Sequence, residues 1–329
     1  MAVIHGTKGA DVLLGALNEI NEIWGHRDGD TLTGGKLEDL LIGGKGDDII
    51  WGDTGNDTLV GNTGDDSLKG SVGHDLVLGG EGNDTVSGGK DDDAIAGGKG
   101  DDYLDGNSGN DIVAGGSGND KVFGMSGDDI LDGGAGDDLV SGGTGDDIVF
   151  ASSGHDAYLG GEGADTIDFS KILGKLNIDL GQHSAKFGSG NHAVNDAISG
   201  FETIVGNDAG GSFKGDKGAQ AFITGAGNDL FRGMGGSDKF TGGDGADTYT
   251  LLKKDTAGHA VDEITDFNVY EDHLNLKDFL KGHHSYDQAV RFVDHGDSTM
   301  VQGLVKGHWT DVVQLDGVHS DDLGYNIFA

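Results

Sequence analysis

The sequence repeats itself every nine residues over almost half of its length. From residue 25 to 168 it divides without a gap into sixteen nonapeptides, such as GGKGDDIIW (43–51) and GGTGDDIVF (142–150). The sixth position is Asp in all sixteen of them. A short and unbroken period indicates a stack of small identical units, each of which contacts only its neighbours.

Each nonapeptide is predicted to contain one turn and one short strand. Glycine recurs at positions one, two and four, where it permits positive φ and close approach of neighbouring backbones. The three residues after the Asp form a strand whose middle side chain points inward. Two nonapeptides then make one coil of eighteen residues. The inward positions are Leu32, Leu41, Ile50, Leu59, Leu68, Val77, Val86, Ile95, Leu104, Val113, Val122, Leu131, Val140, Val149, Tyr158 and Ile167.

Composition supports this reading and excludes several others. With 66 Gly and 35% hydrophobic residues, the chain is too rich in glycine for a conventional packed core. Collagen is excluded because Pro is absent and no three-residue period appears. The absence of Pro fits a fold in which every backbone N–H enters a hydrogen-bond ladder.

The charge predicts bound cations. The 58 acidic and 21 basic residues give a formal net charge of -37, so a compact form repels itself unless cations neutralise it. Nucleic acid is excluded as a partner on the same ground. Cys is also absent, so in an extracellular protein another cross-link, such as bound metal, must replace disulfides.

The nonapeptide GGxGxDxUx, in which U is a large apolar residue, resembles the RTX family of calcium-binding repeats. The resemblance implies an all-β fold, a right-handed parallel β-roll or β-solenoid. It also implies that calcium is enclosed by Asp side chains and turn carbonyls of adjacent turns. Carried over to this chain, one row of ligands is Asp30, Asp48, Asp66, Asp84, Asp102, Asp120, Asp138 and Asp156, and the other is Asp39, Asp57, Asp75, Asp93, Asp111, Asp129, Asp147 and Asp165.

The chemistry of the residues agrees with calcium. Carboxylates and carbonyls are hard oxygen ligands, and neither Cys nor clustered His competes for a softer metal. Eight turns per row leave seven gaps, so two rows offer about 14 sites. Filling all of them moves the net charge to roughly −9.

Weaker repeats flank this main array of residues 25–168. Residues 1–24 are interpreted as a degenerate N-terminal capping coil, with Asp11 in place but Asn21 where Asp is expected. Residues 169–205 resemble calcium-poor interrupting coils. Residues 206–250 form a second array of five repeats with Phe213, Phe222, Phe231, Phe240 and Tyr249 inward. Of these repeats only the last three keep the ligand, as Asp229, Asp238 and Asp247, which predicts one good site between the turns of Asp229 and Asp247.

The segment 251–329 is predicted to be a β-rich C-terminal cap. Its stretch DEITDFNVYEDHLNLKDFL (262–280) resembles the C-terminal region that directs RTX proteins to a type I (ABC) exporter. The first residues carry no basic and apolar leader, and no run of about 18 apolar residues predicts a membrane span. Export by the type I route to the cell surface or the medium is the expectation.

No catalytic motif is found, so the chain is predicted not to be an enzyme. Seven of the thirteen His lie between His259 and His319, but no HExxH motif is present, and no GxSxG elbow marks a nucleophile. The histidines are interpreted as solvated polar residues of the cap.

Two functions remain open. The first is a stand-alone secreted calcium-binding protein of adhesin or matrix type, with a polysaccharide or another cell-surface component as its partner. The second is an auxiliary C-terminal module of a secreted enzyme such as an alginate epimerase, lipase or protease. A Met followed at once by a repeat favours the first. One outward face is rich in Leu, Ile and Val, which indicates a flat contact surface for a partner, a second copy or a polysaccharide, although strand propensity alone also accounts for that face.

Overall fold

The computed structural model describes residues 1–188, 194–255 and 261–329, and its regular secondary structure is almost entirely β-strand. The chain forms two compact units, Met1–Ile167 and Asp168–Ala329. No helix in the described ranges is long and apolar enough to cross a membrane. Of the histidines that the sequence analysis interprets as solvated residues of the cap, His259 lies outside the described residues.

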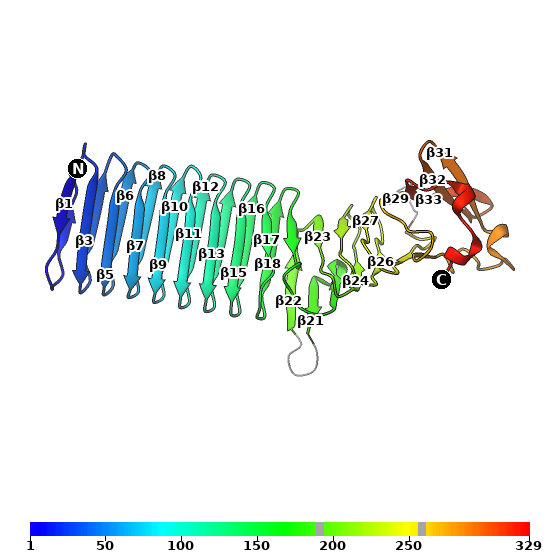
Figure 1. Cartoon of the computed structure of the whole chain (residues 1–329), viewed down its shortest axis with the longest axis horizontal. Coiled ribbons are helices and arrows are strands. Elements are labelled where there is room, and N and C mark those ends of the chain that lie inside the picture. Colours follow the sequence, from blue (N-terminus) through cyan, green and yellow to red (C-terminus); the bar gives the residue numbers. More distant parts are fainter. Residues whose placement is uncertain (189–193, 256–260) are drawn as a thin grey trace. The chain divides into compact units, whose positions relative to one another are not determined.

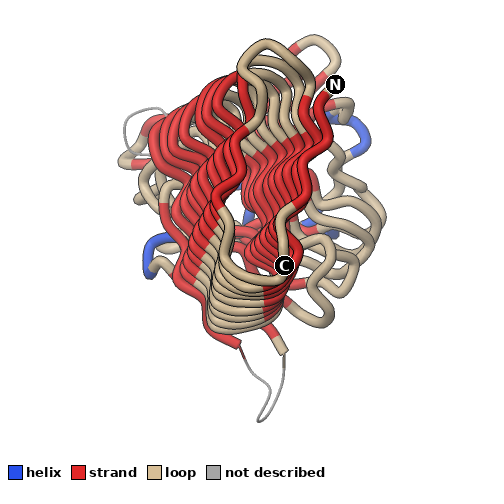
Figure 2. The backbone as a smooth tube through the Cα atoms, turned by 90° about the vertical axis from the view of Figure 1, so that its left-hand side faces the viewer, coloured by secondary structure: helices blue, strands red, loops and turns tan. Residues whose placement is uncertain are grey.

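In the first unit the strands alternate between two parallel stacks. Figure 1 shows the successive strands side by side, and Figure 2 shows the coils end-on. The odd stack contains β1 (Ala2–His5), β3 (Asn21–Arg27), β5 (Leu40–Lys45), β7 (Thr58–Thr63), β9 (Leu76–Glu81), β11 (Ala94–Lys99), β13 (Ile112–Ser117), β15 (Ile130–Ala135) and β17 (Ile148–Phe150). The even stack contains β2 (Val12–Leu14), β4 (Thr31–Gly35), β6 (Ile49–Thr54), β8 (Ser67–Val72), β10 (Thr85–Lys90), β12 (Tyr103–Ser108), β14 (Lys121–Ser126), β16 (Leu139–Thr144) and β18 (Ala157–Glu162). Strand β19 (Thr166–Asp168) lies at the boundary of the unit.

The register confirms the coil of eighteen residues. Leu104 of β12 lies between Val86 of β10 and Val122 of β14, so paired residues are one coil apart in the sequence. The same parallel register continues through both stacks. This arrangement is the all-β parallel roll expected from the repeat, and it fits a right-handed β-roll.

The eighth-position side chains form the core of the first unit. All sixteen are buried, and none is more than 3% exposed. Each strand from β4 to β19 contributes one such residue, for example Leu131 of β15 and Val140 of β16. Residues on either side of it face outward, as in the exposed–buried–intermediate pattern of β15. The core is therefore one side chain thick from each stack.

Glycines hold the turns together because neighbouring coils touch there through their backbones. Gly98 and Gly100 have φ of 120° and 117°, in the region that L side chains rarely adopt. A Cβ atom added at Gly100 meets the carbonyl oxygen of Gly82, one coil earlier. Where position two is not Gly, as at Asn62 with φ 77°, the backbone keeps the same left-handed conformation.

The second unit continues the pattern of two parallel stacks with shorter strands. One stack contains β20 (Leu176–Asp179), β24 (Gly211–Lys214), β26 (Leu230–Arg232), β28 (Thr248–Thr250) and β30 (His273–Asn275). The other contains β23 (Thr203–Val205), β25 (Ala221–Ile223), β27 (Lys239–Thr241) and β29 (Asp262–Ile264). Short 3-10 helices are η1 (Leu180–Gln182), η3 (Tyr286–Gln288), η4 (Ser320–Asp322) and η5 (Tyr325–Ile327).

Aromatic rings fill the core of this unit. The predicted inward residues Phe213, Phe222, Phe231, Phe240 and Tyr249 are all buried. The rings of Phe231 and Tyr249 stack with centroids 5.1 Å apart, and those of Phe222 and Phe240 are 5.7 Å apart. The larger side chains supply more apolar contact per coil than the Leu, Ile and Val of the first unit.

Two segments differ from a plain solenoid. In the region 169–205, which resembles calcium-poor interrupting coils in sequence, β21 (Ser184–Phe187) and β22 (Val194–Ser199) instead pair antiparallel beside β20. In the C-terminal region, β31 (Val290–His295), β32 (Ser298–Val305) and β33 (His308–Asp316) form an antiparallel meander. Strands β29 and β30 extend the two stacks beyond residue 250, so the roll runs further into the segment 251–329 than predicted.

Candidate metal centres

The predicted ligand rows lie along the two edges of the roll, where each turn meets the following strand. The sixteen sixth-position aspartates of the main array are all buried, with at most 4% of their surface exposed. Asp residues are rarely buried to this extent unless they are paired or bind a metal. The buried carboxylates of these rows therefore need hydrogen-bond donors or a bound cation.

One carboxylate oxygen of each aspartate joins adjacent coils. The backbone N–H of Asp84 donates to Oδ1 of Asp102 at 2.7 Å, and the N–H of Asp102 donates to Oδ1 of Asp120 at 2.8 Å. The same bond, always over eighteen residues, runs along the second row, as from Asp93 to Asp111. The side chains thus form two continuous ladders from coil to coil.

The second oxygen, Oδ2, lacks a hydrogen-bond donor. It lies against the first-position glycine of its own repeat, because a Cβ added at Gly97 meets Oδ2 of Asp102. A buried carboxylate oxygen without a donor is costly, and a divalent cation removes that cost. Oδ2 is buried without a hydrogen-bond partner in Asp30, Asp39, Asp48, Asp57, Asp66, Asp75, Asp84, Asp93, Asp102, Asp111, Asp120, Asp129, Asp138, Asp147, Asp238 and Asp247.

Burial also makes these carboxylates weak acids in the absence of a cation. Desolvation raises the pKa of Asp57, Asp66 and Asp102 to about 7, although the N–H bond from the preceding coil opposes the shift. Neighbouring aspartates of the same row add repulsion in the same direction. The pKa of Asp48 and Asp84 is raised to about 6 by the same burial.

The donor set fits calcium. Within the described residues, no three His, Cys, Asp or Glu side chains come together as a cluster that could hold a metal ion. Each gap between coils instead offers carboxylate oxygens and the carbonyl oxygens of glycine-rich turns. These are the hard oxygen donors that calcium takes in flexible geometry. The aspartates, turn carbonyls and missing donors are therefore consistent with calcium between coils.

Asp156, the last member of the first row, differs from the others. Its Oδ2 accepts a hydrogen bond of 2.7 Å from the hydroxyl of Tyr158. That hydroxyl in turn accepts the backbone N–H of Ser152 at 2.9 Å. Here a protein donor meets the need that is unmet along the rest of the row, and sequence reasoning treated Asp156 like its neighbours.

In the second unit the rows of Asp229, Asp238 and Asp247 are longer than the sequence analysis predicted. The N–H of Asp238 donates to Oδ1 of Asp262 at 3.0 Å, and the N–H of Asp247 donates to Oδ1 of Asp272 at 2.9 Å. Gln220 keeps the backbone bond to Asp238 at 2.9 Å. The missed signal was the Asp-x-apolar pattern of DEI (262–264) and DHL (272–274), which imitates the strand of a repeat.

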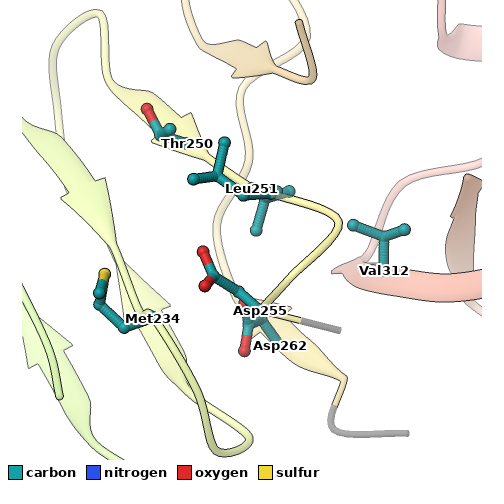
Figure 3. A pocket seen from close by; sticks show the side chains of 7 residues that line it. Met234, Thr250, Leu251, Asp255, Asp262 and Val312 are labelled. Atoms are coloured by element: carbon teal, nitrogen blue, oxygen red, sulfur yellow. The ribbon is translucent and has the colours of Figure 1, made fainter. Parts of the chain in front are cut away.

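A small cavity lies at the end of one of these rows. Figure 3 shows the carboxylates of Asp255 and Asp262 beside it, with Met234, Leu251 and Val312 around them. Its volume of about 10 Å³ is room for one water-sized particle. The guanidinium of Arg232 lies 3.6 Å from Oδ2 of Asp255 and already supplies a positive charge there.

Comparison with protein families agrees with the geometry of the rows. The model of the RTX calcium-binding nonapeptide repeat matches in overlapping blocks over residues 24–167 and again over 215–249, which is more than half of the chain. The chain belongs to the RTX calcium-binding nonapeptide repeat family. Calcium is therefore the cation that the repeats of this RTX protein bind.

Other comparisons add little. No curated protein matches the chain. Among solved structures, the chain is similar to the extracellular lipase LipA from Serratia marcescens, with 14% identity and a TM-score of 0.29. The match covers 84% of this RTX chain and 45% of the lipase chain, so the chain spans less than half of that lipase's length.

We predict that Asp102→Asn lowers the number of bound calcium ions and raises the calcium concentration needed for folding. The amide keeps an oxygen that accepts the N–H of Asp84, but the side chain loses its negative charge. Losing one interaction of a charged group costs about 1.5–3 kcal/mol. Asp101→Asn is the matched control, because Asp101 is an exposed neighbour with the same charge. Equal calcium midpoints for the two variants contradict the ladder as a metal site.

Acidification is expected to act in opposite directions with and without calcium. Between about pH 4 and pH 7 the metal-free roll holds more protons than the unfolded chain, because the pKa of Asp57, Asp66 and Asp102 is raised to about 7. The stability of the metal-free roll therefore falls as the pH rises through this range. Calcium binds the deprotonated carboxylates, so its affinity falls as the pH drops.

Circular dichroism at pH 5.5 and pH 7.5 measures both effects. Without metal, the strand signal should be greater at pH 5.5. With calcium, the midpoint of the titration should lie at a higher concentration at pH 5.5. A midpoint that does not move between these two pH values rules out the buried aspartates as the groups that bind calcium.

Proposed function

We propose that this RTX protein is secreted, folds on extracellular calcium, and acts as a structural or surface-interaction protein rather than as an enzyme. The observation that carries the proposal is the two rows of buried Oδ2 atoms without hydrogen-bond donors. Burying these rows of carboxylate oxygens is unfavourable until cations bind between them. Folding is therefore coupled to a place where calcium is abundant.

The charge of the chain supports coupling between export and folding. At a net charge of -37 the chain stays expanded where calcium is scarce, as in the cytosol, and an expanded chain can pass through an exporter. Extracellular modules load calcium in the range of about 10⁻⁴ to 10⁻³ M. We propose a type I exporter as the partner, with the segment 251–329 as the address that it recognises.

The odd stack provides a surface for an extracellular partner. Seventh-position residues on its outer face form an apolar column in which Leu76 is 41%, Ile112 54%, Ile130 37% and Ile148 38% exposed. Consecutive strands place them in parallel register, as with Ile112 beside Ile130. Contiguous exposed apolar surface of this kind marks interaction sites. A polysaccharide or another cell-surface component is the proposed partner.

A binding role also accounts for the buried ionisable groups better than catalysis does. The carboxylates with raised pKa are spread in rows, and each accepts a hydrogen bond from a backbone N–H of the preceding coil. A catalytic centre instead gathers different groups around one reacting position. The chain is therefore proposed to bind rather than to transform its partner.

Calcium is expected to convert the chain from an expanded to a folded state. Ligand that binds only the folded state stabilises it by RT ln(1 + [L]/Kd) per site, which adds over many sites. Circular dichroism and thermal melting, with chelator and with millimolar calcium, measure the transition. The proposal fails if the chelated protein at pH 7.5 has the strand signal and melting temperature of the calcium-loaded protein.

A second experiment addresses the apolar column. Ile112→Thr with Ile130→Thr should weaken binding of the calcium-loaded protein to surface polysaccharide of the producing cells by about tenfold or more. Threonine keeps strand propensity, so the roll is preserved. Ile49→Thr with Leu159→Thr is the matched control on the even stack, where both residues are similarly exposed. Equal binding by the two double variants removes the odd stack as the contact surface.

A further inference from the structure

The second ladder begins at a residue that is not an aspartate. Asn21 occupies the sixth position of the degenerate nonapeptide 16–24 and is 1% exposed. Its backbone N–H donates to Oδ1 of Asp39, as an aspartate of the row does. The coil therefore joins the roll, but it does so without a carboxylate of its own.

The side-chain amide of Asn21 is surrounded by oxygen atoms. Its Nδ2 donates to the carbonyl of Ala16 at 3.2 Å, to the carbonyl of Glu19 at 3.0 Å and to Oδ1 of Asp39 at 2.8 Å. Its Oδ1 accepts the backbone N–H of Ala16 at 2.8 Å. Both ends of the amide are thus satisfied, and its orientation is fixed by these partners.

The acceptors around Nδ2 are the same atom types that surround a cation between coils. Two are turn carbonyls, at positions one and four of the nonapeptide, and the third is a carboxylate oxygen of the next coil. An amide nitrogen with its two hydrogens carries partial positive charge and points it at all three oxygens. No donor of this kind reaches Oδ2 of Asp39, Asp57 or Asp75 further along the row.

We propose that the amide of Asn21 takes the place of a calcium ion at the start of the second row, so that the coil 16–24 closes without metal. The inference rests on the calcium binding of the repeats that follow. It makes the first coil of this row a metal-free surface on which the coil of Asp39 can assemble. The first metal of the row is then held between the turns of Asp39 and Asp57.

The length of the side chain decides whether an amide can act in this way. Gln220 stands at the same position in the second array, but its Nε2 donates to the side chain of Asp216 at 2.8 Å. Its Oε1 accepts the N–H of the same residue at 3.2 Å. The longer amide therefore bonds within its own turn and leaves the carbonyls aside, whereas Asn21 reaches them.

The test counts calcium ions. Asn21→Asp should bind one calcium ion more than the wild-type protein, because a carboxylate then joins the carbonyls of Ala16 and Glu19 and the carboxylate of Asp39. Asn18→Asp is the control, since Asn18 is exposed in the same nonapeptide and the charge change is identical. Native mass spectrometry in calcium, checked by equilibrium dialysis, gives the number of ions for each.

A second variant keeps the proposal testable if Asn21→Asp does not fold. Asn21→Leu removes the amide without adding a ligand, so the ion count should stay at the wild-type value while hydrogen exchange of residues 16–24 becomes faster. If Asn21→Leu loses one ion, the wild type already holds an ion at this position and the proposal is wrong. An unchanged ion count in folded Asn21→Asp also overturns it, because the expected gain of one ion is then absent. A wild-type protein that binds no calcium contradicts the proposed function itself.

Discussion

The structure depends on a buried carboxylate that recurs along the repeats, in most of them with one oxygen bonded to the preceding coil and the other without a hydrogen-bond donor. The bonded oxygen links each coil to the one before it, as Asp102 links to Asp84. The other oxygen faces its own glycine, where no larger residue fits. The glycine-rich turns, the negative charge and the demand for calcium all follow from this arrangement, because each is needed to bring carboxylates and backbone carbonyls close together.

The apolar core alone is thin in the first unit. One Leu, Ile, Val or Tyr per nonapeptide is buried, and burying such a side chain contributes about 1.5–3 kcal/mol. Ordering the nine residues of a repeat costs several times more in conformational entropy, at roughly 1–2 kcal/mol for the backbone of each residue. Ladder bonds and metal make up the difference there. In the second unit, stacked rings such as Phe231 and Tyr249 bury more surface in each coil, and fewer coils carry an aspartate.

Much of this could be predicted from the sequence because one period governs local and global structure together. The coil of eighteen residues, the buried eighth position and the two rows of aspartates all follow from counting in nines. Asp262 and Asp272 were missed because they follow Asp238 and Asp247 by 24 and 25 residues instead of eighteen. The hydroxyl of Tyr158 and the amide of Asn21 could not be predicted, since their roles depend on where the side-chain tip meets an oxygen atom. The antiparallel strands β21 and β22 break the period altogether.

The alternation of strands between two stacks gives the chain a structural reading frame. Removal of eighteen residues from the main array deletes one coil and leaves every later side chain on its original face. Removal of nine moves each later strand to the opposite stack, so an outer surface that carries Ile112 and Ile130 up to the junction continues beyond it with residues from the other face. Length can therefore vary in steps of one coil without loss of a continuous surface, whereas a half-coil change divides that surface in two.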